Sequence, residues 1–185
     1  MSKTLKSRYA ILGILANAPG SSGYDIHRLM KESTDFFWKE SFSSIYPVLE
    51  TLEKQRLIAQ VEVSSSGRKR KTYKVTKEGK DQLLAWLEEE VEAEPVRREL
   101  LLKLFFGDLC SIDVSRKHVE SYKRLLLQKQ AVFGEVKKAL PAQYPDDPGL
   151  PFWLLTLEFG ILQVRAGLDW CEFAMKKLKL PSPLA

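Results

Sequence analysis

The chain has few of the residues that build disulfide scaffolds and metal centres. Its 185 residues include two cysteines and two histidines. Cys110 and Cys171 lie far apart, and neither belongs to a Cys-x-x-Cys motif. A disulfide framework and a Cys/His zinc site are therefore excluded, and we expect both cysteines to be structural thiols rather than a redox switch.

Signatures of catalysis are also scarce. His27 and His118 are isolated, and the sequence has neither a Gly-x-Ser-x-Gly motif nor a glycine-rich phosphate loop. The acidic run at 88–94 is typical of a solvated helix face. These absences argue against an enzyme, and we expect neither a metal ion nor a cofactor.

Long uncharged apolar runs are missing as well. No stretch approaches the roughly 18 to 20 apolar residues that a membrane span requires. Residues 1–4 do not begin a signal peptide, because no hydrophobic segment with a cleavage site follows them. We therefore expect a cytoplasmic protein that does not bind a membrane.

Positive charge is concentrated in the N-terminal half of the chain. Residues 1–80 contain 15 Lys and Arg against 8 Asp and Glu, a net charge of +7. Residues 81–185 contain 14 against 16, a net charge of −2. This asymmetry predicts that the N-terminal half binds a polyanion and that the other half has a different task.

Two helices are predicted before residue 33. Segment 5–16 is apolar on more than one side, which indicates a helix packed between other elements. The Ala-Pro-Gly-Ser sequence at 18–21 ends it, and Ser22 with Asp25 forms a capping-box pattern that starts the next helix. The connection at 33–41 contains three aromatic residues, which either pack a corner of the core or line a ligand cleft.

A third, short helix follows this connection. Ile45, Val48, Leu49 and Leu52 have the i, i+3, i+4, i+7 spacing of a buried stripe. The outward positions carry small hydroxyls, one aromatic ring and one lysine, which suit a nucleic-acid groove: Ser44, Tyr46, Pro47, Glu50, Thr51 and Lys54.

The start of this third helix depends on two serines. Ser43 or Ser44 is the expected N-cap, which places Pro47 in the first turn, where a missing amide hydrogen costs little. Both serines have a second interpretation, because a hydroxyl at the front of the helix can also contact phosphates or bases.

A β-hairpin with a charged tip is predicted after the third helix. Residues 61–63 start one strand, 64–71 form the loop, and 72–75 return with Tyr73 and Val75 on one face. The loop contains four consecutive cations, Arg68, Lys69, Arg70 and Lys71, which suit phosphates or a minor groove.

The amphipathic helix and the basic hairpin together have the pattern of the recognition half of a winged helix. We expect duplex DNA as the partner, because the deep, narrow major groove of A-form RNA does not admit such a helix. The main alternative is a winged-helix interaction module whose cationic hairpin binds an acidic protein. DNA binding alone predicts enrichment of a dyad-symmetric sequence.

A domain boundary is expected near residue 95. Thr76 caps a helix whose apolar positions are Leu83, Leu84, Leu87 and Val91, and this helix is predicted to stop near Pro95. We therefore place a winged helix-turn-helix domain at 1–94 and an α-helical domain at 95–185. The predicted fold is mainly α with a small β-hairpin.

The second domain is predicted to contain three helices, at 96–106, 115–140 and 152–178. Pro141 and the cluster at 145–149 form the loop before the last helix. The stripe of the long middle helix comprises Val119, Tyr122, Leu126, either Val132 or Phe133, and Val136.

The last helix is apolar on two sides. One stripe comprises Leu154, Leu157, Ile161, Val164 and Leu168. Three helices offer too few partners for both sides, so we expect a homodimer that buries the other stripe. The dimer-interface candidates are Phe152, Leu155, Phe159, Leu162, Trp170 and Phe173, with Ala166 on the same side.

Several sequence landmarks occur in a familiar order: 11–15 (ILGIL), 22–26 (SGYDI), 44–49 (SIYPVL), 52–53, 57–58, 73–76 followed by Gly79, and 99–107 (ELLLKLFFG). With these landmarks the chain resembles the PadR family of bacterial transcriptional regulators, in the branch with a long helical C-terminal domain. The resemblance implies a dimeric repressor. In the hairpin, Gly67 is followed directly by Arg68, where the family commonly has Gly-Pro.

The candidate sites follow from these elements. A symmetric dimer predicts a pseudo-palindromic operator. Lys54 is expected to hold phosphate, and Tyr24 either braces the helix pair or hydrogen-bonds the DNA backbone. An aromatic effector pocket between the domains is one interpretation and core packing the other, for Tyr9, Phe36, Trp38, Trp153 and Trp170. The candidate DNA contacts are Tyr24, Ser43, Ser44, Tyr46, Pro47, Lys54, Arg68, Lys69, Arg70, Lys71 and Tyr73.

Overall fold

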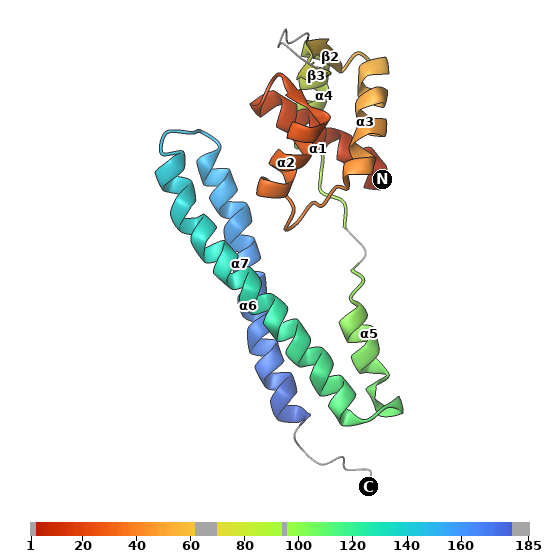
Figure 1. Cartoon of the computed structure of the whole chain (residues 1–185), viewed down its shortest axis with the longest axis vertical. Helices are drawn as coiled ribbons and strands as arrows, with labels where there is room; N and C mark the ends of the chain where they lie inside the picture. The colour runs from red at the N-terminus through yellow and green to blue at the C-terminus, as the bar shows by residue number, and fades with distance from the viewer. Residues whose placement is uncertain (1–2, 62–69, 94–95, 179–185) are drawn as a thin grey trace. The chain divides into compact units, whose positions relative to one another are not determined.

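The structure is a computed structural model that describes residues 3–61, 70–93 and 96–178 (Figure 1). The chain divides into two compact units, Met1–Glu94 and Pro95–Ala185. Helices dominate both units, as the sequence predicts. In the described ranges, no helix is both long enough and apolar enough to cross a membrane.

The N-terminal unit contains four helices and a small antiparallel sheet in its described part (Figure 1). The strand order in the sheet is β1-β3-β2. The elements are α1 (Lys3–Asn17), β1 (Ser21–Ser22), α2 (Gly23–Ser33), α3 (Phe42–Lys54), β2 (Ile58–Val61), β3 (Thr72–Val75) and α4 (Lys77–Glu88).

Helix α1 lies at the centre of this unit and contacts α2, α3, α4 and β3. Its Ile11, Leu12 and Leu15 are almost completely buried, which confirms the prediction of a packed helix. The same core includes the predicted stripe of α3, so that helix presents only its other face to solvent. The core members that follow α1 in the chain are Ile26, Met30, Ile45, Val48, Leu49, Leu52, Leu57, Ile58 and Tyr73.

Three boundaries in this unit differ from the sequence prediction. Strand β2 begins at Ile58, because Ile58 is buried and pairs with Val75. The short strand β1 was not expected from sequence, and it forms because Ser21 pairs with Tyr73. Helix α4 ends at Glu88 rather than near Pro95, since consecutive glutamates oppose the negative end of a helix dipole.

The C-terminal unit contains α5 (Glu99–Phe105), the 3₁₀ helix η1 (Gly107–Leu109), α6 (Ile112–Gln143) and α7 (Leu150–Lys177). Figure 1 shows α6 and α7 as an antiparallel pair. Their contact is built from side chains seven residues apart on each helix, the spacing of left-handed helix pairs. These side chains are Val119, Leu126 and Phe133 on α6, and Leu157, Val164 and Cys171 on α7.

Helix α6 is longer than the sequence predicts. It starts at Ile112 and continues through Pro141, which was expected in the loop. Pro141 is tolerated because it lies in the last turn, where its missing N–H removes one hydrogen bond before the helix ends. Phe133, not Val132, occupies the buried stripe.

Candidate nucleic-acid interface

The outward face of α3 is polar and aromatic, as predicted. Tyr46 is 43% exposed, and Pro47, Glu50, Thr51 and Lys54 are also exposed. The opposite face of α3 is fully occupied by the core of the N-terminal unit. The fold therefore leaves one side of this helix available to a partner.

Helix α3 starts earlier than either predicted cap allows. The N-cap is Ser41, whose hydroxyl accepts a hydrogen bond from the amide of Ser44 (3.2 Å). With Phe42 as the first helical residue, Pro47 lies in the second turn rather than in the first. Its ring leaves the carbonyl of Ser43 without the usual helical donor, and Ser43 is exposed to water.

Glu40 fixes the start of α3 to the rest of the unit. One carboxylate oxygen accepts hydrogen bonds from the Ser7 hydroxyl and the Trp38 indole N–H (3.0 Å), and the other accepts from the Ser44 hydroxyl (2.8 Å). The Ser44 hydroxyl also lies 2.7 Å from the carbonyl of Ser41. Ser44 is thus engaged within the protein, although Ser41 and not Ser44 is the N-cap of α3. Sequence patterns did not indicate Glu40, because its partner Ser7 comes from α1, 33 residues away in the chain.

A capping box starts α2, as predicted. The Ser22 hydroxyl accepts a hydrogen bond from the amide of Asp25 (3.3 Å), and the Asp25 carboxylate accepts one from the amide of Ser22 (3.0 Å). The Ser22 hydroxyl also lies 2.6 Å from this carboxylate. Hydrogen bonding by Ser22 lowers the pKa of Asp25 against the opposing effect of burial, and Arg70 and Arg28 lower it further.

Arg70 connects the basic hairpin to α2. Its Nη2 atom lies 3.6 Å from a carboxylate oxygen of Asp25, and its guanidinium lies 5.3 Å from the ring centroid of Tyr24. Arg70 is 54% exposed, so its charge remains accessible. Tyr24 therefore links α2 to the hairpin through Arg70, and it remains 55% exposed.

Of the remaining hairpin cations, the structure describes one. Lys71 is exposed next to β3. Arg68 and Lys69, two of the four predicted cations, lie outside the described residues. The described base of the hairpin thus presents Arg70 and Lys71 on the unit that carries α3.

Tyr73 does not have the exposed position expected of a DNA contact. Its side chain is 5% exposed and belongs to the core cluster. Burial raises the pKa of its hydroxyl, and nearby Glu53 adds to this effect. Tyr73 lies in the middle strand of the sheet, and its side chain packs in the core of the N-terminal unit. Tyr73 supports the sheet beneath the hairpin instead.

Three of the predicted effector residues belong to the N-terminal unit. The ring of Tyr9 is stacked on Trp86 (centroids 4.5 Å apart), and Trp38 packs against the core, as the core interpretation expects. Phe36 contacts Phe37 edge-to-face.

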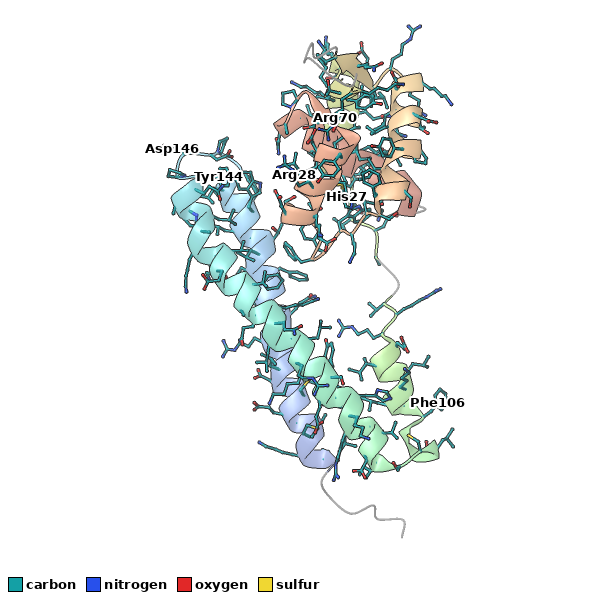
Figure 2. All side chains as sticks on the ribbon, in the orientation of Figure 1. His27, Arg28, Arg70, Phe106, Tyr144 and Asp146 are labelled. Atoms are coloured by element: carbon teal, nitrogen blue, oxygen red, sulfur yellow. The ribbon has the colours of Figure 1, made fainter. Side chains whose placement is uncertain are left out.

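Two further effector candidates belong to the C-terminal unit. Trp153 contacts Tyr144 and Trp170 contacts Tyr122, each edge-to-face. Figure 2 shows Tyr144 near the turn between α6 and α7. Trp153 and Trp170 are about 25 Å apart along a continuous helix. They do not line one small-molecule pocket on the same helix.

The two stripes of α7 differ in exposure. The stripe toward α6 is buried at Leu157 and Val164. Five of the predicted dimer-interface residues are 55% to 68% exposed: Phe152, Leu155, Phe159, Leu162 and Phe173. Trp170 is half-buried because its ring contacts Tyr122. A single copy of the chain therefore leaves this stripe largely uncovered within the C-terminal unit.

Metal ligands are not clustered in the described part of the chain. No group of three or more His, Cys, Asp or Glu side chains there has the arrangement of a metal site. Of the two cysteines, Cys110 is exposed and Cys171 is buried. Burial raises the pKa of the Cys171 thiol, which suits a packing role between α6 and α7.

Each of the two compact units of the chain matches a different family model. Residues 11–85 match the model of the transcriptional regulator PadR-like family. Residues 96–179 match the model described as virulence activator alpha C-term.

Individual proteins resemble the chain over most of its length. A probable transcriptional regulator of Mycobacterium tuberculosis, Rv1176c, is 24% identical over 175 residues, and the match covers 86% of this chain and 90% of that protein. The structure of Vibrio cholerae AphA, a virulence activator, has a TM-score of 0.73 at 23% identity, and the match covers 93% of this chain and 97% of that chain. It supports the fold.

Bacillus subtilis PadR resembles the chain in two liganded crystal structures, each at 26% identity. The complex with operator DNA has a TM-score of 0.75 and covers 94% of this chain and 99% of that one. The complex with p-coumaric acid has a TM-score of 0.70, with 94% and 98% covered. Members of this family are DNA-binding regulators rather than enzymes. With both of its units matched, the chain belongs to the PadR-like family of transcriptional regulators and has a C-terminal unit of the virulence activator alpha type.

Proposed function

We propose that the chain acts as a homodimeric repressor that binds a pseudo-palindromic operator through α3 and the basic hairpin. The observation that carries this proposal is the exposed face of α3 on the same unit as Arg70 and Lys71. A groove-sized helix reads base edges, while cations on the hairpin hold phosphates. Lys54, exposed in the last turn of α3, would add a phosphate contact.

The exposed stripe of α7 supports the homodimer. Large apolar side chains on one helix face favour burial by a partner, and a second copy of the chain provides the same face. A twofold dimer presents two recognition helices about 34 Å apart, one turn of B-DNA. The operator should then contain two inverted half-sites.

The test is selection from a random duplex pool at near-physiological salt, followed by affinity measurements at several salt concentrations. We expect a motif with inverted half-sites about ten base pairs apart. Arg68→Ala and Arg70→Ala should each weaken binding and reduce the salt slope by about 0.9. Glu78→Gln, on the same unit, serves as the control because it adds no phosphate contact.

A different result would favour the protein-interaction alternative. In that case no dyad-symmetric sequence would be enriched, and the alanine variants would leave the affinity for duplex DNA unchanged. A labelled acidic peptide would then compete for the hairpin more effectively than duplex DNA.

We further propose that a small planar aromatic compound relieves operator binding. The support is chemical: p-coumaric acid is bound in a structure of Bacillus subtilis PadR, and this chain has exposed or half-buried aromatic residues in both units. Tryptophan fluorescence and operator affinity should both change on titration with phenolic acids. If neither changes across a panel of such compounds, the effector proposal fails while the operator proposal stands.

A further inference from the structure

An exposed phenyl ring stands at the first position of α3. Phe42 is the first helical residue and is 45% exposed. Ser41 is the N-cap, so Phe42 has no capping role. The core of the unit is complete without it, since Phe42 is absent from the buried cluster. Part of the apolar surface of the ring therefore stays in contact with water in the free protein.

Neighbouring aromatic rings hold the Phe42 ring in place. His27 on α2 lies edge-to-face with it at 5.4 Å and 90°, and Tyr46, one turn along α3, at 5.3 Å and 71°. Tyr24 makes a third contact at 6.5 Å and 70°. A ring fixed by three neighbours loses little conformational entropy when it binds a partner.

A positive charge lies next to this group of aromatic rings. Tyr24, in contact with Phe42, also carries the guanidinium of Arg70 over its ring. Figure 2 marks His27, Arg28 and Arg70 on this unit. A polyanion held by the cations of the hairpin would thus meet an apolar ring at the start of α3.

Within duplex DNA, one group on the base edges suits a phenyl ring. The 5-methyl group of thymine is the apolar feature of the major groove, and first-turn residues of a recognition helix contact base edges there. We propose that Phe42 reads the 5-methyl group of a pyrimidine, in thymine or in 5-methylcytosine. The inference rests on the proposed operator binding by α3.

The experiment uses the selected operator in a fluorescence-polarisation assay with the full chain. Each thymine is replaced in turn by deoxyuridine, which removes only the methyl group. For the wild type we expect one position in each half-site at which this replacement weakens binding about fourfold, the value of burying one methyl group. Phe42→Ala should abolish that penalty at the same position, and Phe42→Leu should keep most of it.

Two controls separate the Phe42 contact from other causes. Phe37→Ala removes a phenyl ring of similar exposure outside α3 and should leave the deoxyuridine penalty unchanged. If Pro47 contacts a different thymine methyl group, deoxyuridine at that position should still weaken operator binding by the Phe42→Ala variant. A second experiment tests whether Phe42 also reads 5-methylcytosine. The sensitive T·A base pair is replaced by a C·G base pair, with and without a 5-methyl group on the cytosine, and the methylated operator should bind about fourfold more tightly.

The outcomes distinguish the two proposals. If the wild type binds the operator but Phe42→Ala retains the whole deoxyuridine penalty, the inference about Phe42 is wrong and the proposed function stands. An operator in which no thymine methyl affects binding also overturns it. Failure to enrich any dyad-symmetric motif overturns the proposed function, and the inference about Phe42 with it.

Discussion

Asp25 joins the start of α2 to the basic hairpin. Its carboxylate completes the capping box with Ser22 and lies 3.6 Å from the guanidinium of Arg70. Both interactions favour the ionised carboxylate, which is why the pKa of Asp25 lies below its ordinary value. A residue that appears from sequence to be a helix cap therefore also positions the base of the hairpin.

The lowered pKa of Asp25 predicts a pH-dependent contribution to stability. The contribution is complete above the ordinary aspartate pKa, about 3.9, and is lost as the pH falls through the lowered pKa of the folded state. Asp25→Asn should reduce the free energy of unfolding by about 0.5 to 1 kcal/mol at pH 7. Urea unfolding at pH 7, 4 and 2.5 should show this difference shrinking toward acid.

Asp81→Asn is the matched control, because Asp81 is exposed on α4 of the same unit. Its effect should be small at every pH. A constant difference between the wild type and Asp25→Asn from pH 7 to 2.5 would contradict the role given to the Asp25 charge.

Gly79 allows α4 to approach the strand segment before β2. A Cβ atom at this position would lie 2.0 Å from the carbonyl oxygen of Leu57. The amide of Gly79 donates to the hydroxyl of Thr76 (3.0 Å), and that hydroxyl lies 3.0 Å from the same carbonyl oxygen. The helix start and the strand thus share one hydrogen-bonded corner.

Gly79→Ala should therefore destabilise the N-terminal unit by about 3 kcal/mol, because a backbone oxygen cannot move aside as a side chain can. Gly13→Ala is the control, since a Cβ at Gly13 meets no atom within 4 Å. That change should stabilise α1 by about 0.5 to 1 kcal/mol. Chemical denaturation followed by circular dichroism measures both, and equal effects of the two changes would refute the steric argument.

Helix α7 has two apolar faces with different partners. One face packs on α6 at seven-residue spacing, and Gly167 permits close approach, since a Cβ there would lie 2.8 Å from a methyl group of Leu126. The other face carries the exposed stripe that we assign to a second copy of the chain. An amphipathic helix needs only the first, so the second face is the stronger argument for assembly.

Charge in the exposed stripe of α7 should separate the dimer. Leu155→Glu combined with Leu162→Glu places two carboxylates in the proposed interface, where burial without a partner costs several kcal/mol. We expect a folded monomer in light scattering, because both positions are exposed in the single chain. Arg165→Glu, an exposed position on α7 outside the stripe, should leave the dimer intact. An unchanged mass for the double variant would exclude this face as the interface.

At the scale of the whole molecule, the two units differ in net charge and in their secondary structure. The excess of cations lies in residues 1–80, whereas residues 81–185 carry a slight negative excess. Each unit has its own packed elements. In the proposed function, DNA binding and pairing of two copies therefore belong to different units of one chain.

This division predicts that pairing, rather than a single recognition helix, determines operator affinity. The Leu155→Glu and Leu162→Glu variant should bind the full operator about as weakly as the wild type binds one half-site, since only one recognition helix is then engaged per complex. Arg165→Glu should retain wild-type affinity. Fluorescence polarisation with full and half operators measures these values, and full affinity in the monomeric variant would contradict the symmetric operator.

The sequence by itself determined the features that depend on local spacing. The capping box of Ser22 and Asp25, the cap at Thr76 and the buried stripe of α3 follow from patterns within a few residues, and each is present. The family landmarks and the three C-terminal helices are local in the same sense. Short-range hydrogen bonds and helical periodicity require no knowledge of distant neighbours.

Only the tertiary structure decided the features that depend on distant partners. Glu40 is tied to α1 through Ser7, and Tyr73 is buried because its side chain packs in the core of the N-terminal unit. The choice between the two faces of α7 depends on where α6 packs, which a periodic pattern does not specify. The contacts of Phe42 with α2 and of Arg70 with Asp25 arise for the same reason: residues far apart in sequence meet only when the helices and strands have packed.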